Sequence, residues 1–205
     1  MSYISIGSFT VQASIIAFFL ALFSGSILYR LSEKRSIGDW YWNSFFLFII
    51  IMKATYIAFN FSIFLDAPLG ILYFTGGTKG EIIAFFGIGL YIAFQSKKHK
   101  HLTHEMLIAY LYYFISYETF VNALQGNWVA TVCNLLLLAG SFWLIKKRTA
   151  YSPINSDQLF ILILLIEALI VSLFDELLSI HRALILSLGI LLLFLKSLSK
   201  EELKE

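Results

Sequence analysis

Residues 158–177 read QLFILILLIEALIVSLFDEL and set the character of the whole chain. The first 17 of these residues carry one charged side chain, Glu167. An apolar run of this length can cross the hydrocarbon core of a bilayer, which takes about 20 helical residues. The 205-residue chain is 59% hydrophobic and 14% charged, with a mean hydropathy of +0.80. Soluble domains are about 45–50% apolar and 25% charged, so we expect an all-α polytopic membrane protein.

Seven apolar runs of this kind follow one another along the chain. Together they use roughly 140 positions at about 20 residues each, and the short connections leave no room for a soluble catalytic domain. We therefore expect a single integral membrane domain over residues 1–205. The seven predicted spans lie near residues 9–29, 41–64, 81–95, 105–124, 127–145, 158–177 and 182–198.

The basic residues give the predicted orientation. Twelve of the fifteen Lys and Arg fall in four groups of three, which follow the first, third, fifth and seventh spans. Basic residues collect on the cytoplasmic side of a membrane, so we expect the N-terminus outside and the C-terminus in the cytoplasm. The four groups are Arg30, Lys34 and Arg35; Lys97, Lys98 and Lys100; Lys146, Lys147 and Arg148; and Lys196, Lys200 and Lys204.

No Lys or Arg precedes the first apolar run. A signal peptide begins with a positively charged region, so we expect the first helix to stay in the mature protein.

The sequence offers little support for a redox or metal site. Its single cysteine, Cys133, excludes an intramolecular disulfide and a Cys-rich zinc site. His99, His101, His104 and Glu105 have a metal-like spacing, but they lie in a cytoplasmic loop beside several lysines. Neighbouring cations oppose metal binding, so we interpret this loop as facing lipid headgroups. We expect no metal, no cofactor and no nucleic-acid partner.

Ionisable residues inside predicted spans are functional candidates, because charge is costly in a bilayer. Lys53 lies half-way along the second span and Glu167 half-way along the sixth. The two could pair with each other in a structural role, or either could face a ligand. Other polar residues of the spans could form bonds between helices: Glu118 with Asn122, and Asn134 with Ser141.

Four ionisable residues cluster at the outer turn between the last two spans: Asp175, Glu176, His181 and Arg182. Histidine titrates near neutral pH, so His181 could carry a proton. An ordinary solvated turn is the alternative.

Residues 66–80 read DAPLGILYFTGGTKG and lead into the third span from the outer side. The glycines allow tight backbone geometry, and a helix N-terminus next to Lys79 could hold an anion such as a lipid phosphate. The alternative is a re-entrant segment in which Gly76, Gly77 and Gly80 are needed for close packing.

Several segments, in the same order, resemble one family. They are IGSFTVQ at 6–12, MKATYI at 52–57 with Phe59-Asn60, PLGI at 68–71 and FTGGTKG at 74–80. The family is the bacterial prolipoprotein diacylglyceryl transferases, and the resemblance covers about residues 4–98. Seven spans with an outside N-terminus also match.

The resemblance implies transfer of diacylglycerol from phosphatidylglycerol to the cysteine of a lipobox peptide, in the bacterial plasma membrane. Cations would hold the departing phosphate, and a base would help to form the thiolate. His181 is the only histidine on the predicted outer side and hence the candidate base. The implied phosphate-binding residues are Lys53, Gly76, Gly77, Lys79 and Arg182, and further polar candidates are Tyr56, Asn60, Thr75, Glu118, Asn122, Glu167, Asp175 and Glu176.

The chain also departs from the family pattern. Thr75 stands where the family has a histidine, and no arginine occurs between Arg35 and Arg148, where the family has an essential one. The nearest segment there, residues 117–122, is acidic. We therefore expect a divergent transferase or, alternatively, a non-catalytic partner that binds a lipid or an envelope lipoprotein. A small-molecule transporter with a Lys53–Glu167 pair ranks lower.

Overall fold

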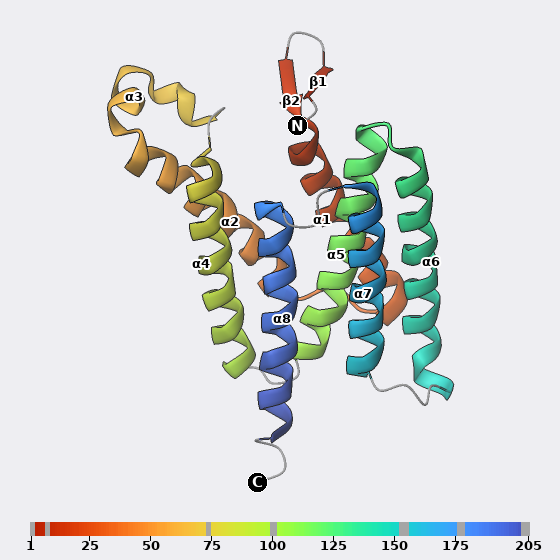
Figure 1. The fold of residues 1–205 in the computed structure, drawn as a ribbon. Helices are drawn as coiled ribbons and strands as arrows, with labels where there is room; N and C mark the ends of the chain where they lie inside the picture. Colours follow the sequence, from red (N-terminus) through yellow and green to blue (C-terminus); the bar gives the residue numbers. More distant parts are fainter. Residues whose placement is uncertain are drawn as a thin grey trace. The chain divides into compact units, whose positions relative to one another are not determined.

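The computed structural model describes residues 3–6, 9–72, 75–98, 102–151, 156–175 and 179–201 (Figure 1). The expected helical class is confirmed: apart from one short hairpin, the elements of this part of the chain are helices. In chain order they are β1 Tyr3–Ile6, β2 Phe9–Gln12, α1 Ala13–Glu33, α2 Asp39–Phe59, α3 Phe61–Asp66, the 3-10 helix η1 Pro68–Leu72, α4 Gly77–Lys98, α5 Leu102–Leu124, α6 Trp128–Tyr151, α7 Ser156–Phe174 and α8 Ile180–Glu201.

Six of these helices are long and apolar enough to cross a membrane: α1, α2, α4, α6, α7 and α8. They indicate a multi-pass membrane protein. The remaining long helix, α5, covers the fourth predicted span and carries polar side chains within that span, among them Glu118, Thr119 and Asn122. Seven crossings therefore stay a prediction.

The ends of several helices differ from the predicted ones. Residues 9–12, predicted as the start of the first helix, form β2 and pair antiparallel with β1 in the register Tyr3↔Gln12. Their Thr and Val favour a strand, although the apolar character of the segment continues into α1. The second predicted helix stops at Phe59, because Asn60 leaves the helical conformation with φ −130°. The third begins at Gly77, four residues earlier than predicted.

Packing divides the chain into two compact units. The first consists of Met1–Ile37 and Leu107–Leu177, and the second of Gly38–Met106 and Leu178–Glu205. The first unit holds the hairpin, α1, most of α5, α6 and α7. The second holds α2, α3, η1, α4, the start of α5, and α8. One domain over the whole chain stays a prediction.

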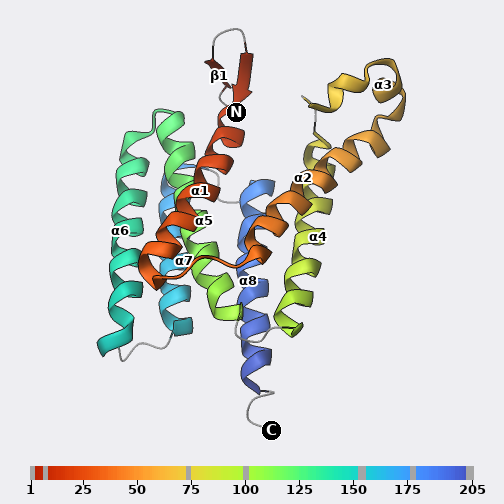
Figure 2. The same cartoon turned by 180° about the vertical axis from the view of Figure 1, so that it is seen from behind.

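In the first unit, α5 lies beside α1, α6 and α7 (Figures 1 and 2), and an aromatic contact joins it to each of them. Ring centroids lie 6.0 Å apart for Phe18 of α1 and Tyr113, 6.5 Å for Phe142 of α6 and Tyr112, and 6.0 Å for Phe160 of α7 and Tyr110. Short connections join α5 to α6 and α6 to α7, so α6 runs antiparallel to both. α5 and α7 therefore run parallel.

In the second unit, α4 packs against α2 on one side and α8 on another. The contact with α2 is close because small residues stand at a spacing of four, Gly76 directly before α4 and Gly80 and Ala84 within it. A Cβ atom at Gly80 would lie only 2.6 Å from Thr55 Oγ1 of α2. The N–H of Gly76 also donates to the carbonyl of Met52 at 3.2 Å, so the start of α4 is tied directly to the backbone of α2.

Candidate functional site

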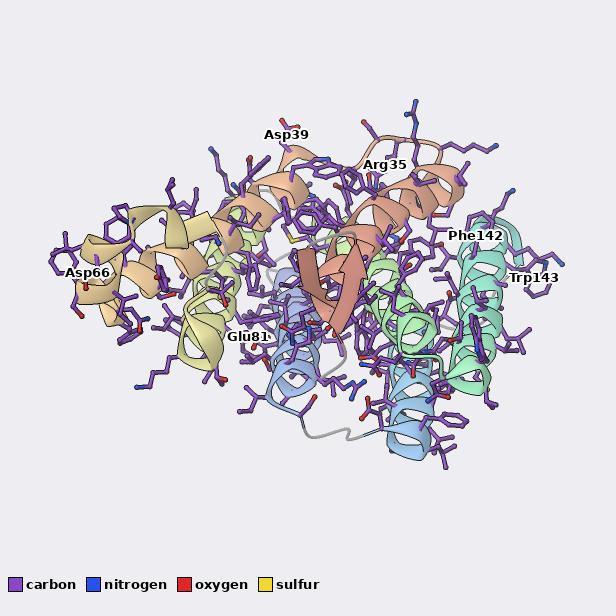
Figure 3. All side chains as sticks on the ribbon, turned by 90° about the horizontal axis from the view of Figure 1, so that it is seen from above. Arg35, Asp39, Asp66, Glu81, Phe142 and Trp143 are labelled. Atoms are coloured by element: carbon purple, nitrogen blue, oxygen red, sulfur yellow. The ribbon has the colours of Figure 1, made fainter. Side chains whose placement is uncertain are left out.

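A carboxylate and an imidazole meet in the second unit, where α4 and α8 begin. Glu81 lies in the first turns of α4 and His181 in the first turn of α8. Nδ1 of His181 contacts Oε1 of Glu81, and Figure 3 shows Glu81 at the start of α4, on the side of α8. Both side chains are partly buried, at 28% and 20% exposure. Phe85, one turn along α4, packs edge-on against the imidazole with a centroid distance of 6.0 Å.

This geometry orients the imidazole for proton transfer. A carboxylate that accepts from Nδ1–H fixes the tautomer in which Nε2 takes up a proton. Histidine–carboxylate pairs of this kind occur in acyl-transfer enzymes. The pair supplies the carboxylate partner that an imidazole base uses, and Nε2 of His181 is buried in this structure.

Sequence reasoning missed Glu81. It is the only acidic residue between Asp66 and Glu105, and a lone carboxylate at the start of an apolar span is a signal that could have found it. Its partner lies 100 residues away in sequence, so only the packing of α4 against α8 shows that the two are paired.

The three basic residues predicted to bind phosphate lie on different helices of this unit and differ in exposure. Arg182, directly after His181, is buried with 7% exposure. Lys79 is exposed, and its Nζ lies 5.6 Å from the centroid of the Phe59 ring. Lys53 is partly exposed in the middle of α2. Arg182 thus follows His181 directly in the sequence, and Lys79 lies against Phe59 at the end of α2.

The glycines of the predicted anion site have different surroundings. At Gly76 and Gly80, the side chain of Thr55 fills the space that a Cβ atom would take. Gly77 has φ +59°, a conformation suited to glycine, and a Cβ atom there would meet nothing within 4 Å. Thr75 beside them is exposed. Packing accounts for Gly76 and Gly80, and phosphate binding by this segment stays a prediction.

Two further candidates lie near the end of α2. Tyr56 is buried, and Asn60 donates from Nδ2 to the carbonyl of Tyr56 at 3.3 Å. At the end of α7, Asp175 is exposed, while Glu176 lies outside the described residues.

Several polar side chains are buried in the first unit. Glu118, Asn134 and Glu167 each have 0% exposure. Asn122 donates from Nδ2 to the Glu118 carbonyl at 2.8 Å, and Ser141 donates to the Leu138 carbonyl at 2.8 Å. Both of these bonds stay within one helix, and bonds between helices through these residues stay a prediction. Lys53 belongs to the second unit and Glu167 to the first, and their pairing stays a prediction.

The metal-like loop has a structural explanation in part. Glu105 accepts hydrogen bonds from the N–H of Gly38 at 2.7 Å and from Nε1 of Trp40 at 2.6 Å, which holds the start of α2. His99 and His101 lie outside the described residues. Among the residues that are described, no group of three or more His, Cys, Asp or Glu could hold a metal ion.

Comparison with known proteins adds no relative. No family model, no curated protein and no solved structure matches the chain.

Proposed function

We propose that this chain is a membrane-embedded transferase that moves a diacylglyceryl group from phosphatidylglycerol to the thiol of a lipobox peptide. The observation that supports the proposal is the Glu81–His181 contact. It supplies a histidine paired with a carboxylate at the start of α4 and α8, which the predicted orientation would put on the outer side, although Thr75 stands where the family has a histidine.

In the proposed reaction, His181 accepts the proton of the peptide thiol. The thiolate attacks the glyceryl carbon that carries the phosphate ester, so a C–S bond forms and the C–O bond breaks. The electron pair of that bond leaves with glycerol phosphate, which can receive the proton back from the imidazolium. Negative charge therefore grows on the phosphate in the transition state, where a cation has its largest effect.

Arg182 is the proposed phosphate-binding cation. It is the only arginine of the second unit, and it lies in the first turn of α8. A helix N-terminus adds a partial positive charge. A planar guanidinium also holds two phosphate oxygens at once, which an ammonium group cannot do. Lys79 is the proposed second cation, placed to meet the lipid as it enters.

The proposed topology has seven spans, the N-terminus outside the bacterial plasma membrane and the C-terminus in the cytoplasm. The segment α3–η1 is proposed to re-enter the outer leaflet between α2 and α4. Its Leu69 is 75% exposed, and Phe61, Ile63 and Leu65 are also exposed, which is costly in water. A nitroxide at Leu69→Cys, in a Cys133→Ser background, should collide more often with oxygen than with a water-soluble nickel complex. The reverse preference would place this segment in water.

The transferase proposal is tested with purified protein in phosphatidylglycerol nanodiscs and a synthetic lipobox peptide. Mass spectrometry should show a diacylglyceryl group added to the peptide, together with release of glycerol phosphate. Loss of a general base typically costs 10²–10⁴-fold in rate, so His181→Ala should lose at least about a hundredfold. Glu81→Gln should also lose rate, because the neutral amide can bind Nδ1 of either tautomer and no longer fixes the one in which Nε2 accepts the proton.

His104→Ala is the matched control, since His104 lies at the start of α5, far along the chain from the proposed site. It should keep the wild-type rate. No transfer by the wild-type protein, where an authentic transferase works under the same conditions, would refute the enzymatic proposal.

A non-catalytic lipid- or lipoprotein-binding partner is the second candidate. The packing of Gly76 and Gly80 against Thr55 favours it, because those glycines then serve the fold and not a reacting lipid. Phosphatidylglycerol that co-purifies, is lost in Arg182→Ala, and is never turned over would identify this function.

A further inference from the structure

Asn134 of α6 is fully buried in the first unit, with 0% exposure. Within the part of the chain that the structure describes, neither its amide nitrogen nor its amide oxygen has a hydrogen-bond partner. An amide can donate two hydrogen bonds and accept two. Leaving all of them unmade in an apolar interior costs several kcal/mol, so a buried asparagine of this kind points to a polar ligand.

Ser116 of α5 is a second such group. Its exposure is 1%, and its hydroxyl likewise has no partner among the described residues. The contact between Tyr112 of α5 and Phe142 of α6 gives a common reference point along the two helix axes. Ser116 then lies about 6 Å, and Asn134 about 12 Å, towards the α5–α6 turn, from a rise of 1.5 Å per residue.

Two buried carboxylates lie between Ser116 and Asn134 along the direction of the helix axes. Glu118 is six residues beyond Tyr112 on α5, or about 9 Å in the same direction. Glu167 is seven residues beyond Phe160, whose ring contacts Tyr110, which places it at about 8 Å on the same scale. Phe160 and Glu167 share one face of α7, because seven residues make nearly two turns. A carboxylate has about four acceptor positions, so each can accept from a ligand in addition to its other contacts.

We propose that the first unit holds a hydroxyl-bearing neutral ligand at Asn134 and Ser116, at the height of Glu118 and Glu167. A hydroxyl group both donates and accepts, which suits an amide and a serine hydroxyl. It can also donate to carboxylates, which accept only. Two sources have this chemistry: water, and the headgroup glycerol of a phospholipid. The glycerol source rests on the proposed function, whereas the water source does not.

The sign of a stability change tests the proposal. Asn134→Leu keeps the approximate volume and removes the amide. If the site is dry, removing an unsatisfied buried amide raises the Tm. If a hydroxyl ligand is bound, the variant loses that ligand and leaves the Ser116 hydroxyl without it, so we expect the Tm to fall by several degrees.

Asn122→Leu is the matched control. Its amide is also buried, but it donates to the carbonyl of Glu118, so its Tm change should not depend on the lipid. Where Asn134→Leu cannot be recovered folded, Ser116→Ala gives the same comparison.

Two lipids separate the two sources. Nanodiscs of phosphatidylglycerol and of phosphatidic acid share the diacylglyceryl phosphate but differ in the headgroup glycerol. A higher wild-type Tm in phosphatidylglycerol that Asn134→Leu abolishes would assign the glycerol. Equal Tm values, with radiolytic hydroxyl labelling of residues 128–145 that is lost in Asn134→Leu, would assign water.

Either of two results would overturn the proposal. One is a rise in Tm for Asn134→Leu in both lipids with no interior labelling, which means a dry site. The other is a stabilisation by sodium over choline that depends on Asn134, which means a cation. None of these measurements requires diacylglyceryl transfer, so failure of the ligand proposal and failure of the transferase proposal can be told apart.

Discussion

The close contact between α4 and α2 predicts that alanine substitutions at Gly76 and Gly80 both destabilise the protein, but that Thr55→Ala restores stability only for Gly80→Ala. Alanine at Gly80 would place its Cβ 2.6 Å from Thr55 Oγ1, while the next atoms, Met52 Sδ and Thr55 Cβ, are both at 3.5 Å. Alanine at Gly76 would lie 2.2 Å from the same Oγ1, but also 2.9 Å from the Cα of Gly80. The first clash involves one hydroxyl, and the second also involves backbone.

Overpacking of this kind costs about 1–3 kcal/mol. For a chain of this length, 1 kcal/mol corresponds to about 2–4 °C in Tm, so Gly80→Ala should lower the Tm by several degrees. Thr55→Ala removes the clashing hydroxyl and leaves an ordinary contact at 3.5 Å. The double variant Gly80→Ala with Thr55→Ala should therefore regain most of the loss. Gly76→Ala should not be rescued, because the Cα of Gly80 remains in the way.

The assay is thermal unfolding in detergent, with the three single variants and the two double variants analysed as two double-mutant cycles. Gly140→Ala is the control, because it lies on an exposed part of α6 and its Cβ would meet nothing within 4 Å. It should keep or slightly raise the Tm, since alanine is the better helix former. A wild-type Tm for Gly80→Ala, or equal rescue at both glycines, would refute this description of the contact.

Three further predictions follow from other parts of the chain. Glu105→Ala should lower the free energy of unfolding by about 2 kcal/mol, because the N–H of Gly38 and Nε1–H of Trp40 both lose their acceptor and a hydrogen bond to a charged acceptor is worth about 1.5–3 kcal/mol. A changed tryptophan emission with an unchanged Tm would count against this prediction. Gly126→Ala should cost about 1 kcal/mol in thermal unfolding, since φ is +80° there, and a neutral result would contradict that conformation. Reporter fusions after each of the four basic groups should all be cytoplasmic, and one outward group would disprove seven crossings.

Much of the helical framework could be predicted from the sequence, because long apolar runs are strong local signals. The ends of the helices were harder. The strand β2 was missed because no Pro or Gly separates it from α1, and the pairing of residues 3–6 with 9–12 is not a local property. The break at Asn60 was missed because neither Pro nor Gly marks it.

For the candidate site too, individual residues could be predicted from the sequence, but contacts between distant residues could not. His181 and Arg182 could be singled out as ionisable residues at a turn between apolar runs. Glu81 could not be assigned to them, because its partner depends on how α4 packs against α8. The glycines of α4 could be expected to matter, but a sequence alone could not show that Thr55 fills the space above two of them.

The helix α5 shows why hydropathy alone misjudges a bundle. Hydropathy measures how well a helix suits lipid, and α5, with residues such as Glu118 and Asn122, is not among the six helices that are apolar enough to cross a membrane. Yet all but one of residues 105–119 are buried, and aromatic contacts join this helix to α1, α6 and α7. A helix surrounded by protein has no need of an apolar surface, and it can carry polar groups that lipid would exclude. The polar residues of α5 are therefore tolerated because the helix lies inside the first unit. A ligand bound at Ser116 would require the same buried position.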